Sequence, residues 1–185
     1  MKIQKNEVSI KQLIASIALI LAFVNPYVEG IEFKEQWVFM VSHYLLFIGG
    51  FLLVYKVFRG NPLLLIPSAI LVVFWHTPYY FALAGSFLSF RLINDISMIV
   101  AGLLAGIGSS SLKLFSWLSL FVLWMTADTA YSIFFLLQVP QYSNVSYPFS
   151  PYSPQQEIQT AVAMWFVMSG VIIYVIGKFL KKLIF

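Results

Sequence analysis

The sequence is short of charge and contains no cysteine. Of its 185 residues, 10% are charged and 61% are hydrophobic, and the mean hydropathy is +0.88. Because a water-soluble domain is about half apolar, this composition excludes a soluble fold and predicts an integral membrane protein. The absence of cysteine excludes disulfides, thiolate metal sites and c-type haem attachment. A soft metal would therefore have to bind methionine, histidine or carboxylate ligands.

The motifs of common enzyme classes are missing too. The sequence has no nucleophile elbow, no phosphate-binding loop and no metalloprotease motif, so no catalytic residues are predicted. Its net charge of +4 does not indicate nucleic-acid binding. The cations lie between the hydrophobic stretches and at the chain ends, where membrane topology requires them.

Six hydrophobic stretches are long enough to cross a bilayer, which takes about 20 residues of helix. The breaks between them contain proline, glycine, serine and charged residues. The sequence therefore predicts an all-α integral membrane protein with one domain over residues 1–185, a bundle of six transmembrane helices. The predicted spans lie near 10–28, 37–58, 62–86, 91–110, 112–137 and 159–180.

The distribution of lysine and arginine predicts the orientation of this bundle. Six spans leave only Lys34 and Arg91 on one side of the membrane and put the other cations on the opposite side. Those others are Lys2, Lys5, Lys11, Lys56, Arg59, Lys113, Lys178, Lys181 and Lys182. Because cytoplasmic loops are rich in Lys and Arg, we expect a multi-pass cell-membrane protein with both termini in the cytoplasm. The long last loop is then extracytoplasmic, and its Asn144-Val145-Ser146 triplet makes Asn144 a candidate glycosylation site.

Four ionisable residues fall inside the predicted spans: His43, His76, Asp95 and Asp128. Ionisable groups are unfavourable in a bilayer, so each is a candidate functional residue. With a rise of about 1.5 Å per residue, all four lie in the extracytoplasmic half of their helices. The sequence therefore predicts a polar layer at that depth.

Each aspartate in this layer needs a partner. Arg91 stands four residues before Asp95, one helical turn away, which predicts a local ion pair. Nothing in its own helix neutralises Asp128, so we expect a partner from another helix, with His43 or His76 the natural choices. A proton relay through His43, His76 and Asp128 is one function that this arrangement predicts.

Methionines are concentrated at the same depth. Met40 stands three residues before His43, and Met125 three before Asp128, so each pair shares a helix face. Thioethers select Cu(I) and imidazole accepts both oxidation states of copper, which predicts a copper site. The candidate ligands are His43, His76, Met40, Asp128, Met125 and Met164. The alternative is that the methionines only fill space between helices.

Pro78 gives His76 a second interpretation. A proline within a membrane helix frees a carbonyl of the preceding turn, here near Phe74, and neighbouring groups must satisfy it. His76 or Thr77 stands where such a group is needed. On this hypothesis the role of His76 is structural.

Four segments together resemble a known family. They are Met40-Val41-Ser42-His43-Tyr44-Leu45-Leu46, Trp75-His76-Thr77-Pro78, Val139-Pro140-Gln141-Tyr142, and Gln155-Gln156-Glu157 followed by Met164-Trp165. In order and approximate spacing, from about residue 37 to 170, the chain resembles the CtaG-like family of cytochrome c oxidase assembly factors, especially small archaeal members of uncharacterised function. It departs from the pattern where Phe39 replaces the first histidine of a pair, and where Asn94-Asp95 stands near expected histidines.

The resemblance implies an accessory or assembly protein of a haem-copper terminal oxidase that handles copper on the extracytoplasmic side. Its partners would be membrane lipid and other subunits of a respiratory oxidase. One alternative is a non-catalytic structural subunit of a membrane respiratory complex. A third hypothesis is a redox subunit in which His43 and His76 bind haem b.

Overall fold

The fold is all-α, apart from one pair of two-residue strands. The structure, a computed structural model, describes residues 2–3 and 9–184; Lys5 lies outside them, and the side chains of Lys2, Lys178, Lys181 and Lys182 are not described. The elements are β1 (Lys2–Ile3), α1 (Ile10–Phe23), α2 (Pro26–Glu32), α3 (Gln36–Val54), β2 (Phe58–Arg59), η2 (Pro62–Leu64), α4 (Leu65–Trp75), α5 (Pro78–Ser86), α6 (Leu88–Ser109), α7 (Leu114–Leu136), η3 (Pro140–Tyr142) and α8 (Pro154–Ile184).

Between four and six of the described segments are long and apolar enough to cross a membrane. Four are single helices: α3, α6, α7 and residues 154–177 of α8. Two more are bent pairs, α1 with α2 at 58° and η2–α4 with α5 at 70°. The first bend follows Asn25, whose side chain caps α2, and the second precedes Pro78. The protein is thus a multi-pass membrane protein.

The observed helices differ from the predicted spans mainly at their ends. The predicted span 37–58 ends at Val54, because β2 pairs antiparallel with β1 immediately afterwards. The predicted span 91–110 begins earlier, at Leu88, since only Phe87 separates α5 from α6. The last helix begins at Pro154, five residues before the predicted start at 159. Proline fits the first turn of a helix because its missing N–H has no partner there in any case.

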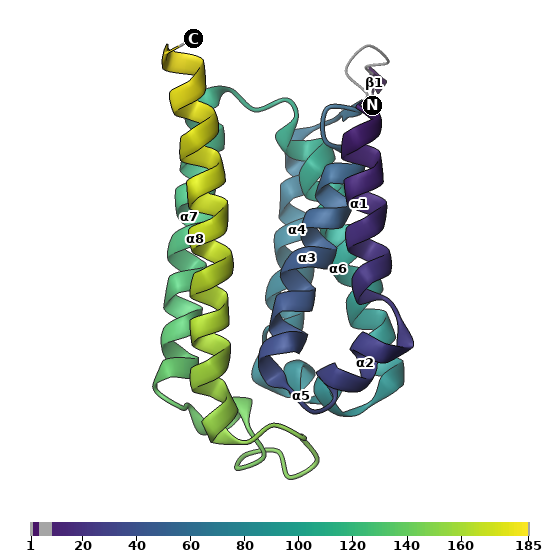
Figure 1. Ribbon diagram of the computed structural model, residues 1–185, viewed down its shortest axis with the longest axis vertical. Helices are drawn as coiled ribbons and strands as arrows, with labels where there is room; N and C mark the ends of the chain where they lie inside the picture. The colour runs from purple at the N-terminus through teal and green to yellow at the C-terminus, as the bar shows by residue number, and fades with distance from the viewer. Residues whose placement is uncertain (1, 4–8, 185) are drawn as a thin grey trace.

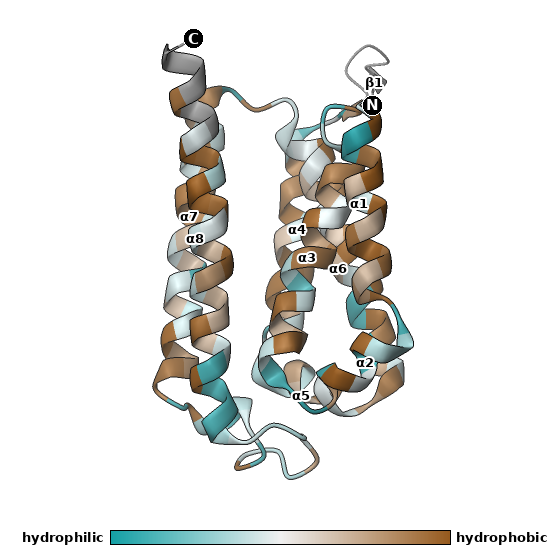
Figure 2. Ribbon diagram, viewed as in Figure 1, coloured by the Kyte–Doolittle hydropathy of each residue, from teal (hydrophilic) through white to brown (hydrophobic). Residues whose placement is uncertain are grey.

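The helices form two groups (Figure 1). Helices α1 to α6 make a bundle, and α7 and α8 make an antiparallel hairpin beside it. Helix α1 begins and α8 ends at the same end of the molecule, which we call the terminal end; the opposite end, with α2, α5 and the loop 138–153, is the loop end. Figure 2 shows that the middles of the helices are mostly hydrophobic and that hydrophilic residues gather at the loop end of α8.

Close backbone contact joins α3 to α6 at the centre of the bundle. A Cβ atom on Gly102 would collide with the Phe47 carbonyl oxygen, and one on Gly50 would collide with the backbone of Ile99. Small residues allow membrane helices to approach in this way. The contact lies in the terminal-end halves of α3 and α6 and fixes the two helices relative to each other, while most of their buried polar residues lie in the loop-end halves.

The hairpin buries far less of its surface than the bundle does. In the most hydrophobic window of α3 and of α6, 50% of the residues are buried, against 11% for α7 and 22% for α8. Large side chains such as Phe115 and Phe166 are 81% and 76% exposed. Because these surfaces are apolar, lipid or another membrane protein covers them.

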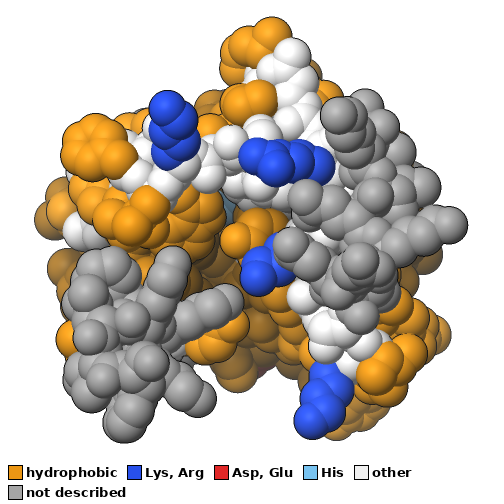
Figure 3. Space-filling view, turned by 90° about the horizontal axis from the view of Figure 1, so that it is seen from above, with side chains coloured by type: hydrophobic (Ala, Val, Ile, Leu, Met, Phe, Trp, Pro, Cys, Tyr) orange, Lys and Arg blue, Asp and Glu red, His pale blue; other side chains and the backbone are white. Residues whose placement is uncertain are grey.

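The terminal end is basic. Figure 3 looks onto this end and shows Lys and Arg side chains with no acidic side chain in view. The exposed cations at the ends of the described helices and strands here are Lys11, Lys56, Arg59 and Lys113. This agrees with the predicted clustering of cations at one end of the helices.

Candidate functional site

The bend between α4 and α5 is held by the two residues before Pro78. The Thr77 hydroxyl donates to the Phe74 carbonyl at 2.7 Å, and Nδ1 of His76 lies 2.7 Å from the Val72 carbonyl. Both bonds satisfy carbonyls of the interrupted helix. The prediction that Thr77 or His76 satisfies the freed Phe74 carbonyl is therefore confirmed for Thr77, whereas His76 bonds the Val72 carbonyl, which also accepts the His76 backbone N–H.

His43 and His76 lie side by side, and we call them the histidine pair. Their ring centroids are 5.3 Å apart in an edge-to-face arrangement. A carbonyl only accepts hydrogen bonds, so His76 Nδ1 carries the hydrogen in its bond to Val72, and Nε2 keeps its lone pair in the neutral ring. Such a bond fixes the tautomer and orientation of metal-binding histidines. His43 is only 2% exposed, and neither of its nitrogens completes a hydrogen bond, although the side chain of Asn94 on α6 faces it.

Aromatic rings enclose the histidine pair. Phe39, one turn before His43 on α3, packs edge-on against the His43 ring with centroids 4.3 Å apart. On the other side, Tyr131 of α7 lies 5.2 Å from the His76 ring. The Tyr131 hydroxyl is buried without a hydrogen-bond partner. The histidine pair thus combines unsatisfied nitrogen atoms with a mainly aromatic wall.

Asp128 has a partner from another helix, but the predicted partner is wrong. Tyr44 of α3 donates its hydroxyl to Asp128 Oδ1 at 2.6 Å. Consecutive residues of a helix point about 100° apart, so Tyr44 faces the hairpin while His43 faces His76. The predicted relay through His43, His76 and Asp128 is therefore interrupted, with a tyrosine where the imidazole was expected.

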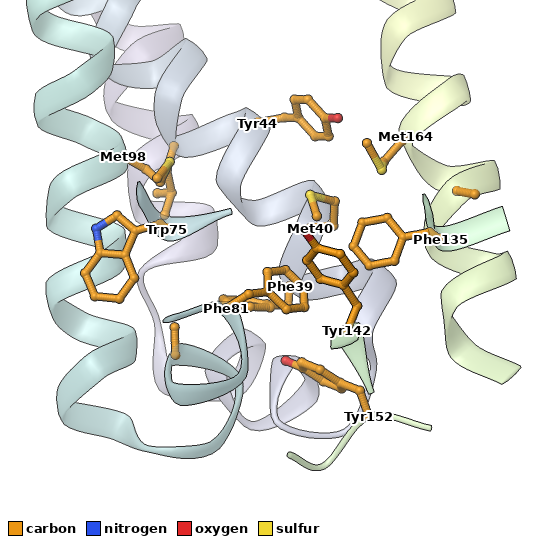
Figure 4. Close-up of a cluster of buried hydrophobic side chains, with 13 residues drawn as sticks. Phe39, Met40, Tyr44, Trp75, Phe81, Met98, Phe135, Tyr142, Tyr152 and Met164 are labelled. Carbon is orange, nitrogen blue, oxygen red and sulfur yellow. The ribbon is translucent and has the colours of Figure 1, made fainter. Parts of the chain in front are cut away.

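The predicted methionine ligands are mostly core residues. Met40 of α3 and Met164 of α8 are fully buried in one hydrophobic cluster with Phe135 of α7 (Figure 4). Met98 lies in another part of that cluster, beside Trp75, and Met125 is half-buried on α7. Within the described ranges, no three His, Asp or Glu side chains are grouped to hold a metal ion. Asp128 does not complete such a group with the histidine pair.

A second buried polar group lies nearer the loop end. We call it the arginine cluster: Arg91 and Asp95 of α6, Glu29 and Glu32 of α2, and Tyr152 of the loop. Arg91 is completely buried, and its Nη1 lies 2.8 Å from Glu32 Oε2 and 4.0 Å from Glu29 Oε2. Asp95 faces Glu29, and both of its oxygens lack a hydrogen-bond partner.

The predicted ion pair between Arg91 and Asp95 is wrong. Side chains of a helix lean toward its N-terminus, so Arg91 extends away from Asp95, toward the start of α6. There its Nε donates to the Ala84 carbonyl at 2.8 Å, and its Nη2 donates to the Gly85 carbonyl at 3.1 Å. Its central carbon also lies 4.2 Å from the ring centroids of Phe33 and Phe39, a cation–π geometry.

Two tyrosines from the loop 138–153 close both groups. Tyr142 donates its hydroxyl to the His76 carbonyl at 3.1 Å, while Gln36 donates to the Tyr142 carbonyl at 2.9 Å. Tyr152 donates to the Glu32 carbonyl at 2.7 Å and accepts from Arg91 at 3.2 Å. Burial raises the pKa of Tyr152 well above its usual value. Asn144 of the same loop is exposed, and its glycosylation stays a prediction.

The residues that sequence reasoning missed are those that pair over long distances. Glu32 and Arg91 are 59 residues apart, and Tyr44 and Asp128 are 84 apart. Glu32 falls between the predicted spans 10–28 and 37–58. One signal was available: Arg91 follows directly after the apolar stretch 78–90, so a buried counter-ion from another segment was as plausible as Asp95.

These features define a multi-pass, all-α membrane protein with two groups of buried polar side chains toward its loop end. Comparison with family descriptions identifies the chain as a member of the DUF1404 family, which is described as a protein of unknown function and matches residues 14–182. No curated protein and no solved structure matches the chain.

Proposed function

We propose that this protein is an accessory or assembly protein of a haem-copper terminal oxidase, and that it carries copper as cargo at the histidine pair. The observation that carries the proposal is the contact between His43 and His76, whose ring centroids are 5.3 Å apart. It is supported by the resemblance of the segments 40–46, 75–78 and 139–142 to the CtaG-like family, in the same order. The proposal makes the protein a metal handler and not an enzyme.

The donor atoms of the histidine pair fit copper. His43 offers two buried nitrogens without partners, and the bond from His76 Nδ1 to Val72 leaves Nε2 as the donor. Met40, three residues before His43, adds a thioether on the same face of α3. Imidazole and thioether ligands suit Cu(I), which also accepts low coordination numbers. The hydrophobic surroundings would exclude water from the bound ion.

The proposal includes an orientation. Six spans, counting each bent pair as one, put both termini on the same side of the membrane. The basic terminal end would be cytoplasmic by the positive-inside rule, and the loop 138–153 would be extracytoplasmic. Copper would then be bound in the extracytoplasmic half of the protein. Asp128, Met125 and Met164 lie in the same half, on the surrounding helices.

Metal analysis of the purified protein tests this function. The protein in detergent is reconstituted with Cu(I), passed over a desalting column and analysed for copper, beside the His43→Ala, His76→Ala and double variants. We expect one copper per chain in the wild type and none in the double variant. The matched control is Met98→Leu, because Met98 lies away from Met40 beside Trp75. Absence of copper from the reconstituted wild type would overturn the proposal.

A non-catalytic structural subunit of a membrane respiratory complex is the second candidate function. The observation that favours it is the exposed apolar surface of α7, since only 11% of the residues in its most hydrophobic window are buried within the chain. Purification in mild detergent separates the two candidates. A stable subunit elutes with an oxidase in stoichiometric amount, whereas an assembly protein elutes mostly on its own.

Haem b between His43 and His76 is supported less well. Two axial histidines must stand on opposite faces of the macrocycle, but here the two rings are in edge-to-face contact. Haem binding would require α3 and the α4–α5 bend to move apart. A Soret band in the visible spectrum of the purified protein would favour it over copper.

A further inference from the structure

The arginine cluster contains more acidic groups than its single cation can balance. Glu32 and Asp95 are 0% and 2% exposed, and Glu29 is 8% exposed, while Arg91 is the one buried cation beside them. Three ionised carboxylates against one guanidinium would leave two uncompensated negative charges. Each unpaired buried charge costs several kcal/mol, and a membrane environment provides little water to offset this. A further positive charge must therefore reduce the excess negative charge of the arginine cluster.

The hydrogen bonding of the cluster is also incomplete. Five buried carboxyl oxygens have no donor: both of Glu29, both of Asp95, and Oε1 of Glu32. Ser42 of α3 is 1% exposed, and its hydroxyl faces the Glu32 carboxyl without completing a hydrogen bond. Buried acceptors normally have partners. A positively charged hydrogen-bond donor would both reduce the excess negative charge and give the unpaired oxygens a partner.

The geometry favours a proton over a metal ion. A hard cation such as Ca²⁺ takes six or more oxygen ligands, yet no three carboxyl or imidazole side chains in the described part of the chain are grouped to hold one. A proton needs only two facing oxygens, and Asp95 faces Glu29. We propose that the arginine cluster is a proton-binding site in which the carboxyl groups of Asp95 and Glu29 share one proton, which removes one of the two uncompensated charges and leaves the other spread over both carboxyl groups.

The other charged and titratable groups around this pair come from α2, α3, α6 and the loop 138–153. Helix α2 contributes Glu29 and Glu32, and α6 contributes Arg91, which the Glu32 carboxylate already neutralises at 2.8 Å. Helix α3 contributes His43, which packs against Phe39 and not against the carboxyl pair. Helix α5 supplies only backbone carbonyls to Arg91, and the loop supplies the Tyr152 hydroxyl.

Glu29 is the most exposed carboxyl of the arginine cluster. The Glu29 side chain is 11% exposed, whereas those of Arg91 and Glu32 are 0% exposed. Protons would therefore enter and leave at Glu29, from the loop end, and Asp95 would be the interior acceptor. This site is separate from the histidine pair, and it stands whether or not His43 and His76 bind copper.

Infrared spectroscopy tests the shared proton directly. The purified protein in detergent at neutral pH is expected to show the carbonyl stretch of a protonated carboxyl group, which shifts in heavy water. The Asp95→Asn variant should lose this band, and Glu29→Gln should shift it, because the sharing partner is gone. Glu35→Gln is the matched control, since Glu35 is a carboxyl near the same end but outside the cluster. Difference spectra between variant and wild type cancel the contribution of Glu157, the other buried carboxyl.

Two results would overturn the proposal. One is a band that is absent from the wild type or unchanged in both Asp95→Asn and Glu29→Gln. The other is saturable binding of Na⁺ or Ca²⁺, measured calorimetrically on the wild type and lost in Glu29→Gln, since a metal ion would then supply the missing charge. Because Glu29 lies at the edge of the cluster, its variant keeps the test usable if Asp95→Asn fails to fold.

Discussion

At the scale of single residues, Arg91 of α6 connects α2, α5 and the loop 138–153 through its side chain. It donates to two carbonyls, to Glu32 and to Tyr152, and it lies between the rings of Phe33 and Phe39. The planar guanidinium suits all of these contacts at once, because its donors point outward in a fixed fork while its faces stack on rings. A lysine has neither the fork nor the face.

We therefore expect Arg91→Lys and Arg91→Met to destabilise the fold. Removing one partner of a buried ion pair costs about 3–5 kcal/mol, and in Arg91→Met Glu32 would remain buried without its cation. Arg91→Lys would keep the charge but lose the fork of donors and the ring contacts. Thermal unfolding in detergent should show a lower Tm for both variants. In Arg91→Met/Glu32→Gln much of the loss should be recovered, because no unpaired charge remains. A wild-type Tm in Arg91→Met would contradict the central role of this residue.

Tyr152 predicts a pH dependence of stability. Its folded-state pKa lies above the unfolded value of about 10, so folding favours the neutral phenol. Its contribution is complete below about pH 10 and is lost as the pH rises toward the folded-state pKa. Stability measured against pH should therefore fall less steeply above pH 10 in Tyr152→Phe than in the wild type. Tyr27→Phe is the control, because Tyr27 is 78% exposed, and its alkaline slope should match the wild type.

At the scale of elements, sequence patterns located the helices well and their long-range partners poorly. Hydrophobic length located the longer helices, although α2 falls mostly between two predicted spans. Pro78 predicted the bond from Thr77 to Phe74. Both predictions depend only on neighbours in the chain. The partners of Arg91 and Asp128 depend on how α2 lies under α6 and how α3 faces α7. Spacing along one helix carries no information about these arrangements. The sequence therefore predicts Asp95 as the partner of Arg91 and a histidine as the partner of Asp128, whereas the partners are Glu32 and Tyr44.

The contact between α3 and α6 gives a prediction at this scale. In Gly102→Ala the added methyl group would meet the backbone of α3 at Phe47 and Phe51, and overpacking of this kind costs roughly 1–3 kcal/mol. We expect a lower Tm in detergent. In Gly170→Ala on α8 the methyl group would meet nothing within 4 Å, so the variant should be neutral or stabilised by up to about 1 kcal/mol through helix propensity. Equal effects of the two changes would contradict the close contact.

At the scale of the whole molecule, the bundle and the hairpin are joined by a few identifiable interactions near the loop end. Core side chains such as Met40 and Met164 pack together there. Polar links cross the same boundary: Thr160 of α8 donates to Gln36 at 3.0 Å, and Tyr44 donates to Asp128 at 2.6 Å. Toward the terminal end the two groups of helices diverge (Figure 1).

A double-mutant cycle measures the link between Tyr44 and Asp128. Tyr44→Phe removes the donor and Asp128→Asn removes the charge of the acceptor. A hydrogen bond to a charged group contributes roughly 1.5–3 kcal/mol, so the unfolding free energies of the single and double variants should be non-additive by a similar amount. Additive effects would mean that this bond does not join the hairpin to the bundle.

The closing role of the loop 138–153 has a consequence for biosynthesis. Tyr142 and Tyr152 follow α7 in the chain, so every residue of the histidine pair and the arginine cluster except Tyr152 is synthesised before the segment that closes them. Until the loop and α8 have been synthesised, the polar side chains at the loop end lack the segment that covers them. The segment that covers the two polar groups is therefore synthesised last. During translation there is an interval in which their side chains are accessible before this segment is in place.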